Sequence, residues 1–453
     1  MKSTRRSFIL ASGAFAFGAG RAMAQSAKTN LRIGVVSDIH IMKKGLPDEL
    51  YIYGSDTIFR KTLKYFRERK VDAVIIAGDM ANTGLIKELN LVANAWKEIF
   101  PGNKGADGAR VEPVFIYGNH DAASWGNKNV DQLINSDPAG VWKRAFGWDY
   151  SPVGIVDVKG YKFVTVNWGH GKELPQFLEA HRNELKGSKP FFYVQHIHPA
   201  GTLTSCSESD TTVSDALSKF PNAVAFSGHS HESLALDNVI WQGAYTSIGT
   251  SALSYISLPS NCVDNHESPA TSPMPWASDL GKDAMIVDVL DNGVLSIESR
   301  QMVDDEPLCA VRMVAVPPRG GDESWAFNAQ RARAVAPEFP AGAKITEWRE
   351  QGVSRVTSIQ NQVVLTFPAA QIVKGNGRAV TYRIEVFKDG EDKPVYSSNI
   401  VAPLYFRAPK RAPKIITARI PTSALPEETL TYKVAAVDCW GNAGKSLSLR
   451  VEV

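Results

Sequence analysis

Three stretches of the chain share one layout: LRIGVVSDIH at residues 31–40, VDAVIIAGD at 71–79 and VEPVFIYGNHD at 111–121. Each begins with an apolar run, which predicts a buried strand, and ends in residues that can bind a metal ion. Between them, residues 57–70 and 86–100 carry apolar side chains at helix spacing. Strands that alternate with helices predict an α/β fold with a largely parallel, buried sheet.

Further strands follow downstream. Residues 154–167 predict a hairpin that turns at Lys159-Gly160, and residues 190–195 and 223–227 are short apolar strands. The turn Asp291-Asn292-Gly293 predicts a second hairpin between residues 284–290 and 294–299. Residues 258–282 are rich in Ser, Pro and Asn, a composition typical of a long surface loop.

Potential metal ligands stand at the carboxyl end of five predicted strands, where an open α/β sheet places its site. Residues two apart on an extended chain point to the same side, so Asp38 and His40 can converge on one cation. A lone Gly-Asp is usually a turn, and a lone histidine is usually structural. The five motifs are Asp38-Ile39-His40, Gly78-Asp79, Gly118-Asn119-His120-Asp121, His196-Ile197-His198 and Gly228-His229-Ser230-His231.

In this order and spacing, the motifs resemble those of the calcineurin-like metallophosphoesterases, a superfamily that includes purple acid phosphatases and cyclic-nucleotide phosphodiesterases. The resemblance covers roughly Leu31 to Arg300. It implies a four-layer α/β/β/α sandwich with a two-metal centre between the strand ends. It also implies that one metal is bound by Asp38, His40 and His229, the other by Asn119, His196 and His231, and that Asp79 bridges both.

The chemistry of phosphoester hydrolysis suits such a ligand set. Two neighbouring cations lower the pKa of a bridging water and stabilise the charge of an in-line displacement. Oxygen and nitrogen ligands without a thiolate fit two divalent or mixed-valence ions of Fe, Mn or Zn. The resemblance implies attack by a metal-bridging hydroxide, with His120 assisting the leaving group, and Asp121 could orient the His120 ring. A purely structural role for His120 is the alternative.

The residues that contact substrate are less defined by the sequence. His196 and His198 both suit the fourth ligand position, and we favour His196 because it follows the apolar run 191–194 more closely. His198 then lies on the substrate side or behind a ligand. Trp125, Trp168 and His170 follow strand ends and could form a stacking wall, although packing in loops is the alternative.

Beyond about residue 305 the helix periodicity fades and strand alternation takes over, as at Tyr382, Ile384 and Val386. This pattern predicts an all-β sandwich, and its last turn, 438–442, resembles that of an immunoglobulin or fibronectin III-like module. The predicted domains are residues 25–305, which are catalytic, and residues 306–453, which are accessory.

The start of the chain predicts export. Of 453 residues, 50 are Lys or Arg and 47 are Asp or Glu, and four of the basic residues lie within residues 1–24, which contain no acid. Arg5-Arg6 followed by a short uncharged stretch and Ala22-Met23-Ala24 resembles a twin-arginine signal peptide cleaved after Ala24. The apolar run is shorter than the ~20 residues of a membrane span. We therefore expect the twin-arginine export machinery as a partner, and a periplasmic or secreted mature protein without a span.

The four cysteines suit an oxidising compartment. We expect Cys206 to pair with Cys262 and Cys309 to pair with Cys439, with free buried thiols as the alternative. Their spacing disfavours a zinc ribbon or a thioredoxin-like site.

Two functions remain open on the sequence. The first is an exported phosphoesterase acting on small-molecule phosphate mono- or diesters. The second is a non-catalytic metal- or surface-binding envelope protein whose β-sandwich carries the function. The nearly balanced charge predicts no stable nucleic-acid binding.

Overall fold

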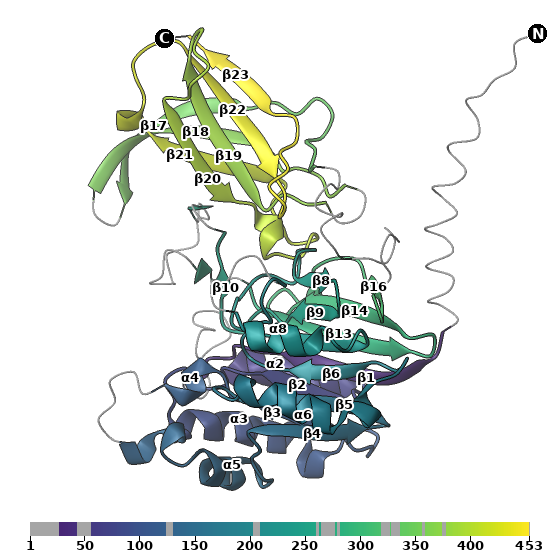
Figure 1. Ribbon diagram of the computed structural model, residues 1–453. Coiled ribbons are helices and arrows are strands. Elements are labelled where there is room, and N and C mark those ends of the chain that lie inside the picture. Colours follow the sequence, from purple (N-terminus) through teal and green to yellow (C-terminus); the bar gives the residue numbers. More distant parts are fainter. Residues whose placement is uncertain are drawn as a thin grey trace, which may run out of the picture.

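The computed structural model contains two stacked domains, a larger α/β domain and a smaller β domain (Figure 1). Residues 1–26, which include the expected signal peptide, lie outside the described part, as do Trp125 and Cys206. The structure describes residues 27–42, 56–123, 130–202, 209–259, 262–263, 277–278, 281–318, 327, 336–355, 358–373 and 377–452.

The first sheet of the α/β domain has seven strands. Strands β1, β2 and β3 are parallel, β13 pairs with β1 in antiparallel fashion, and β14 pairs with β13 in the same way. The short strands β15 and β16 both pair with β14. The bounds are β15 Glu306–Pro307, β14 Val294–Gln301, β13 Asp283–Leu290, β1 Thr29–Val36, β2 Ala73–Ala77, β3 Glu112–Ile116 and β16 Arg312–Ala315.

The second sheet has six strands in the order β4-β5-β6-β7-β9-β8. Strands β5, β6, β7 and β9 are parallel, whereas β4 and β8 pair with their neighbours in antiparallel fashion. The bounds are β4 Val153–Val158, β5 Tyr161–Val166, β6 Phe191–Val194, β7 Ala223–Ser227, β9 Thr246–Gly249 and β8 Ile240–Gln242.

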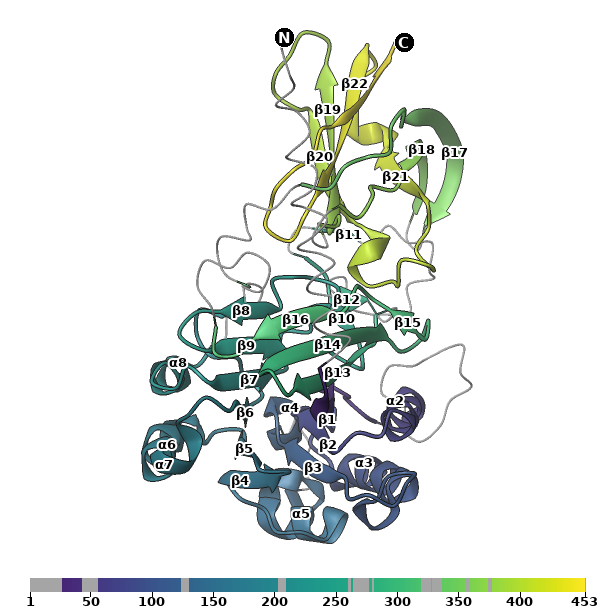
Figure 2. The same ribbon diagram turned by 90° about the vertical axis from the view of Figure 1, so that its right-hand side faces the viewer.

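Helices cover the outer face of each sheet, so the four-layer α/β/β/α arrangement is confirmed (Figure 2). Helices α2 and α3 cover the first sheet, and α6 and α8 cover the second. Short helices complete the loops at the strand ends. The bounds are α2 Asp56–Glu68, α3 Ile86–Ile99, α4 Asn119–Ala122, α5 Pro138–Phe146, α6 Leu174–Ala180, α7 Arg182–Leu185 and α8 Thr211–Leu217.

Strand alternation distributes the apolar side chains between the layers. In β6, Phe192 and Val194 join the core between the sheets, whereas Phe191 and Tyr193 pack against the outer helices. Such strands are buried on both faces, which explains their continuous apolar sequences. Gly34 of β1 lies against the ring of Phe66 from α2, where a Cβ would lie 2.6 Å from a ring carbon, so the helix packs directly on the strand.

The C-terminal domain is a β-sandwich, as its alternating sequence predicts. One sheet has the order β11-β20-β19-β22-β23, and the other has the order β17-β18-β21. Tyr382, Ile384 and Val386 of β19 face Val363 and Leu365 of β18 in a shared buried core. The bounds are β11 Cys262–Val263, β20 Tyr396–Val401, β19 Thr381–Lys388, β22 Leu430–Val437, β23 Leu447–Val451, β17 Thr346–Arg355, β18 Ser358–Pro368 and β21 Ile415–Pro421.

The predicted boundary at residue 305 needs correction. Strands β15 and β16 extend the first sheet, and Phe327 exchanges hydrogen bonds with Gln242 of β8 at 2.6 and 3.0 Å. The α/β domain therefore continues past residue 305. Part of the expected surface loop 258–282 also crosses to the second domain, because β11 pairs with β20. Sequence periodicity missed both links because they join segments distant in the chain.

The expected disulfide between Cys309 and Cys439 is wrong, because both residues are free thiols in the structure. The Cys309 thiol lies 3.9 Å from the carbonyl oxygen of Leu234, and Cys439 packs against the core of the α/β domain. Burial raises the pKa of the Cys439 thiol to about 12. The side chains of Cys206 and Cys262 lie outside the described part. Among the described helices, none has the length and apolar character to cross a bilayer.

Candidate metal centre and catalytic site

The predicted ligands gather where strands of both sheets end. Asp38 and His40 follow β1, and Asp79 follows β2. Asn119 begins α4 after β3, His196 follows β6, and His229 and His231 follow β7. Most of these side chains are buried, with Asp38, His40 and His196 fully inaccessible to solvent.

Five of the predicted ligands adopt left-handed backbone conformations. Their φ angles are 50° for Asp38, 47° for His40, 52° for Asp79, 67° for His229 and 53° for His231. Such conformations cost on the order of 1 to 3 kcal/mol each outside glycine and concentrate at functional sites. Asp38 and His40 therefore converge through turns after the strand, and not through the extended chain that the sequence suggested.

Backbone hydrogen bonds hold these turns against one another. The amide of Asp38 donates to the carbonyl of Gly78, and the amide of His40 donates to that of Asp79, both at 3.0 Å. The ladder between β1 and β2 thus continues past the ends of both strands. This pairing supports the strained conformations, because such backbone persists where the surrounding structure holds it in place.

Asp38, His40 and His231 form the first cluster of candidate ligands, with ligand atoms within 4.8 Å of one another. Nε2 of His231 lies 3.0 Å from Oδ1 of Asp38 and 3.3 Å from Nε2 of His40. The Nε2 atom of His40 lies 3.8 Å from the same carboxylate oxygen.

Asp79, His196 and His229 form the second cluster. Nε2 of His196 lies 3.1 Å from Oδ2 of Asp79, and Nδ1 of His229 lies 3.1 Å from Oδ1 of Asn119. Oδ2 of Asp79 also lies 3.6 Å from Nε2 of His40 in the first cluster. Asp79 therefore stands between the two clusters, in the place expected of a bridging ligand.

The expected assignment of His229 and His231 to the two metals is reversed in the structure. His231, and not His229, joins Asp38 and His40, whereas His229 joins His196 and Asn119. The physical reason is a tight turn, in which the amide of Ser230 donates to the carbonyl of Gly228 at 2.7 Å. Because both histidines of this turn have positive φ, their rings diverge and do not share one side.

The donor set fits metal ions. Nδ1 of His196 lies 2.8 Å from the carbonyl of Ala77, and Nδ1 of His231 lies 2.8 Å from that of Tyr255. A ring that donates through Nδ1 keeps the lone pair of Nε2 for a cation. Nε2 of His196 is buried and makes no well-aligned hydrogen bond among the described residues, although Oδ2 of Asp79 lies 3.1 Å away. Oxygen and imidazole donors suit Fe, Mn or Zn.

The charges of the site also call for cations. Burial opposes ionisation of Asp38, yet the neighbouring His231 and His196 hold the pKa of its carboxyl well below the ordinary value. Burial likewise disfavours a charged His196, but the carboxylates of Asp79 and Asp38 raise the pKa of this imidazole to about 10. Two carboxylates buried in one site require positive charge nearby, which metal ions would supply.

His120 lies beside the two clusters and forms a third group of potential ligands with His40 and Asp79. Its backbone amide donates to Oδ1 of Asp79 at 2.8 Å, and its ring meets that of His40 edge to face, with centroids 4.4 Å apart. Nδ1 of His120 lies 2.7 Å from the backbone carbonyl of Asn82. This geometry directs the opposite edge of the ring, which carries Nε2, away from Asn82.

Asp121 does not orient His120 in the way that the sequence suggested. Its buried carboxylate accepts from the amides of Ala81 at 2.7 Å, Gly118 at 2.8 Å and Met80 at 3.2 Å. Burial, together with the charge of Asp79, raises the pKa of Asp121 to about 7. Asp121 therefore ties the loop after β2 to the loop after β3.

Asn82 was not predicted from the sequence, although it contacts both His40 and His120. Its side-chain Oδ1 lies 3.1 Å from Nδ1 of His40, and its backbone oxygen holds His120. The only sequence signal is its position three residues after Asp79, which does not by itself indicate a contact. Tyr255 was also missed; its ring packs on that of His231, with centroids 4.1 Å apart.

Comparison with known families agrees with this geometry. The family model described as calcineurin-like phosphoesterase matches residues 31–233. Residues 31–233 thus form a calcineurin-like phosphoesterase domain. The protein is accordingly a metal-dependent phosphoesterase, a hydrolase of phosphoester bonds.

Solved structures of other proteins are only weakly similar to this phosphoesterase. A dimetal phosphatase from Danio rerio is 12% identical, with a TM-score of 0.36 over 61% of this chain and 97% of its own. The purple acid phosphatase PPD1 from yellow lupin is also 12% identical, with a TM-score of 0.36 over 61% of this chain and 52% of its own. The chain thus spans about half the length of the lupin protein. No curated protein sequence matches.

Glycines allow the ligands of the phosphoesterase domain to approach the backbone. A Cβ at Gly78 would overlap the ring of His196, and one at Gly118 or Gly228 would overlap the carboxylate of Asp79 or Asp38, respectively. Gly78 also has a φ of 91°, which favours glycine. The Gly residues of the sequence motifs are therefore required by close packing around the ligands.

Of the residues predicted to contact substrate, some lie beside the ligand clusters and others do not. Trp168 lies beside the second cluster, with its ring 6.2 Å from that of His196 and 6.4 Å from that of His229. His198 is buried, and burial together with the charge of His229 lowers the pKa of its ring to about 4. His170 instead pairs with Glu173 at 2.8 Å. Trp125 lies outside the described residues.

Proposed function

We propose that this phosphoesterase is an exported enzyme with two metal ions that hydrolyses phosphate mono- or diesters. The observation that carries the proposal is the pair of ligand clusters that meet at Asp79. Two cations held there would activate a water, bind phosphoryl oxygens and stabilise the developing charge. Asp38, His40 and His231 would hold one of them, and Asn119, His196 and His229 the other.

His120 is the proposed general acid for the leaving oxygen. With Nδ1–H donating to the carbonyl of Asn82, the charged form of the ring holds its second proton on Nε2. A proton there can pass to the oxygen that leaves phosphorus, which is the role of a general acid. The amide contact between His120 and Asp79 keeps this ring next to the site of charge development.

The position of Trp168 beside the second cluster favours a small organic phosphoester as substrate. Trp168 is partly exposed and stands beside His196 and His229, where its ring can stack on a planar or sugar group of the substrate. The substrate oxygen atoms would then face the ligand clusters, while the organic group rests on the indole.

The test is an assay with p-nitrophenyl phosphate and its bis ester after chelation and repletion with Mn, Zn or Fe. We expect turnover that requires a metal and is restored by at least one of these ions. The rate ratio between monoester and diester then assigns the preferred substrate class. Absence of metal-dependent turnover on a wide panel of phosphoesters would instead favour the non-catalytic binding protein.

We also propose that the enzyme reaches the periplasm or the exterior through the twin-arginine machinery. The support is the sequence Ser3-Thr4-Arg5-Arg6-Ser7-Phe8-Ile9-Leu10, followed by an uncharged stretch and Ala22-Met23-Ala24. Export of a folded protein would allow metals to be loaded before translocation. Conversion of both Arg5 and Arg6 to Lys should abolish export, whereas equal export of both forms would refute this route.

A further inference from the structure

The segment of residues 255–257 holds the ligand His231 at two points. Nδ1 of His231 lies 2.8 Å from the carbonyl oxygen of Tyr255, and the amide of Ser257 donates to the carbonyl of His231 at 3.0 Å. The Tyr255 ring also packs on the imidazole. The segment therefore sets both the orientation and the tautomer of this ring.

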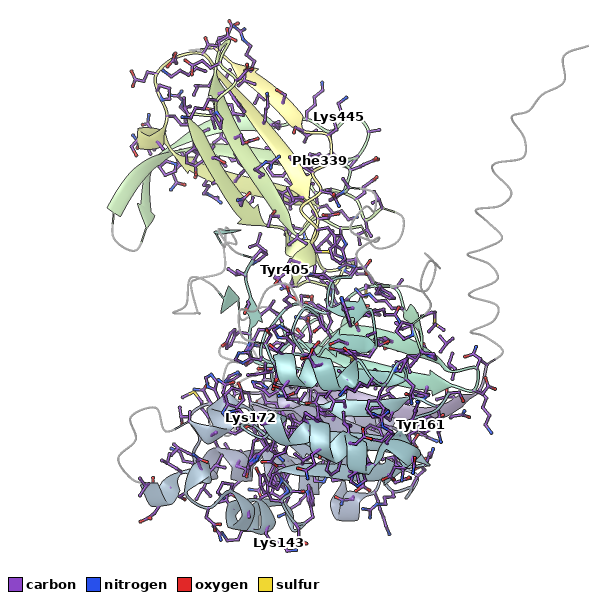
Figure 3. The ribbon with its side chains drawn as sticks, in the orientation of Figure 1. Lys143, Tyr161, Lys172, Phe339, Tyr405 and Lys445 are labelled. Carbon is purple, nitrogen blue, oxygen red and sulfur yellow. The ribbon has the colours of Figure 1, made fainter. Side chains whose placement is uncertain are left out.

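The β-sandwich domain contacts the same segment from the other side. The hydroxyl of Tyr405 donates to the carbonyl oxygen of Ser257 at 2.6 Å. Tyr405 is only 2% exposed and lies at the junction of the two domains (Figure 3). A continuous path of hydrogen bonds thus runs from Tyr405 through Ser257 to His231.

Packing around this path joins the two domains into one core. Ile256, Tyr405 and Phe406 belong to the same buried cluster as the inner faces of the two catalytic sheets. Gly281 lies between Ile256 and Phe406, where a Cβ would be 3.0 Å from that of Phe406. A side chain larger than hydrogen at this position would displace Ile256 or Phe406.

Tyr405 itself is held rigidly by its own domain. It ends a short 3-10 turn, Pro403–Tyr405, in which its amide donates to the carbonyl of Ala402 at 2.8 Å. The buried guanidinium of Arg378 donates to the carbonyl of Leu404 at 3.1 Å and to that of Leu308, in the catalytic domain, at 3.0 Å. Arg378 therefore fixes this turn against the first domain.

From these contacts we infer that the β-sandwich is a structural part of the metal centre, with Tyr405 as a positioning residue for His231. This inference depends on the proposed function in one respect, namely that His231 is a metal ligand. Partners that orient a metal-binding histidine typically contribute 10- to 100-fold in affinity. Because Tyr405 acts through one intervening residue, we expect the lower end of this range.

The test compares Tyr405→Phe with Tyr382→Phe in the full-length chain. Both substitutions remove a buried hydroxyl that makes a hydrogen bond, but Tyr382 contacts the amide of Ala370 within the sandwich core. Titration of the chelated proteins with Mn²⁺, followed by calorimetry, gives the affinity of each binding step. We expect Tyr405→Phe to weaken one step by about 10-fold, and Tyr382→Phe to leave both within about twofold.

Hydrogen exchange supplies a second readout that does not depend on metal. The amide of Ser257 should exchange faster in Tyr405→Phe than in the wild type, because its segment loses an anchor. Unchanged Mn²⁺ affinity and unchanged exchange at Ser257 would overturn the inference. A wild-type protein that binds two Mn²⁺ ions without hydrolysing any phosphoester would refute the proposed function alone.

Discussion

Nε2 of His40 lies 3.3 Å from Nε2 of His231, although 191 positions separate the two residues in the chain. Two neutral imidazoles in this arrangement direct their lone pairs at one another, which is unfavourable unless a cation lies between them. The adjacent Asp38 carboxylate supplies negative charge to the same point. The contact therefore identifies a place in the fold that a metal ion stabilises.

Removal of metal should lower the stability of the protein. Ions that bind the folded state alone stabilise it by about 2.7 kcal/mol when their concentration is 100 times Kd. We expect a chelator to lower the free energy of unfolding by an amount of this order, and Mn²⁺ to restore it. Urea unfolding with and without chelator measures the effect, and an equal midpoint in both would contradict a preformed metal site.

Replacement of His120 should separate catalysis from metal binding. His120→Ala removes the proposed proton donor, so kcat should fall by about 10²- to 10⁴-fold. Metal content, measured by elemental analysis, should stay at the wild-type level. The control is His181→Ala, because His181 stacks on Phe177 in a helix of the second sheet's outer layer. Loss of metal from His120→Ala would assign this residue to the ligand shell.

Asn82→Ala should weaken metal binding while keeping the backbone carbonyl that faces His120. The change removes the Oδ1 atom that lies near Nδ1 of His40, and we expect a 10- to 100-fold loss of affinity for one metal. Asn103→Ala is the matched control, since it removes a contact to the indole of Trp96 away from the centre. Equal Mn²⁺ affinities in the two variants would show that Asn82 does not orient the ligand.

Gly78→Ala should disrupt the second ligand cluster. A methyl group at this position overlaps the His196 ring, whereas Gly102, which also has positive φ, has open space around its Cβ position. Both variants pay the backbone cost of a left-handed alanine, of order 1 kcal/mol. Only Gly78→Ala should lose metal and activity as well. If Gly78→Ala retained both its metal and its activity, the His196 ring would be able to move without affecting the centre.

Asp283 should make the metal-free protein less stable as the pH rises. Burial raises the pKa of this carboxyl to about 7, compared with ~3.9 in an unfolded chain. Between these pH values the folded state binds a proton that the unfolded chain has lost. The free energy of unfolding therefore declines from about pH 4 to pH 7, by up to about 1.4 kcal/mol per pH unit.

Urea unfolding at pH 5 and pH 7.5, in the presence of chelator, tests this dependence. Asp283→Asn should flatten the profile relative to the wild type. Asp288→Asn, in the same strand, removes a carboxylate that pairs with Arg32 and should retain the slope due to Asp283. A wild-type slope in Asp283→Asn would place the titrating group elsewhere.

Local patterns predicted most of the elements of this fold. The apolar runs before Asp38, Asp79 and Asn119 are strands β1, β2 and β3, and the alternation at Tyr382 is strand β19. Such patterns are readable because each strand must match the polarity of the layers on its two faces. The extent of the first domain was missed, because local alternation does not show which sheet a strand joins, and β16 pairs with β14 of the first sheet.

Local sequence patterns established the types of ligand and the strands that end in them, since strand ends of one sheet meet along one edge. How these residues are shared between the two clusters depends on the three-dimensional fold. His229 and His231 separate because a tight turn with positive φ directs their rings apart. Likewise, Asn82 and Tyr405 gained their roles from contacts that no local periodicity encodes.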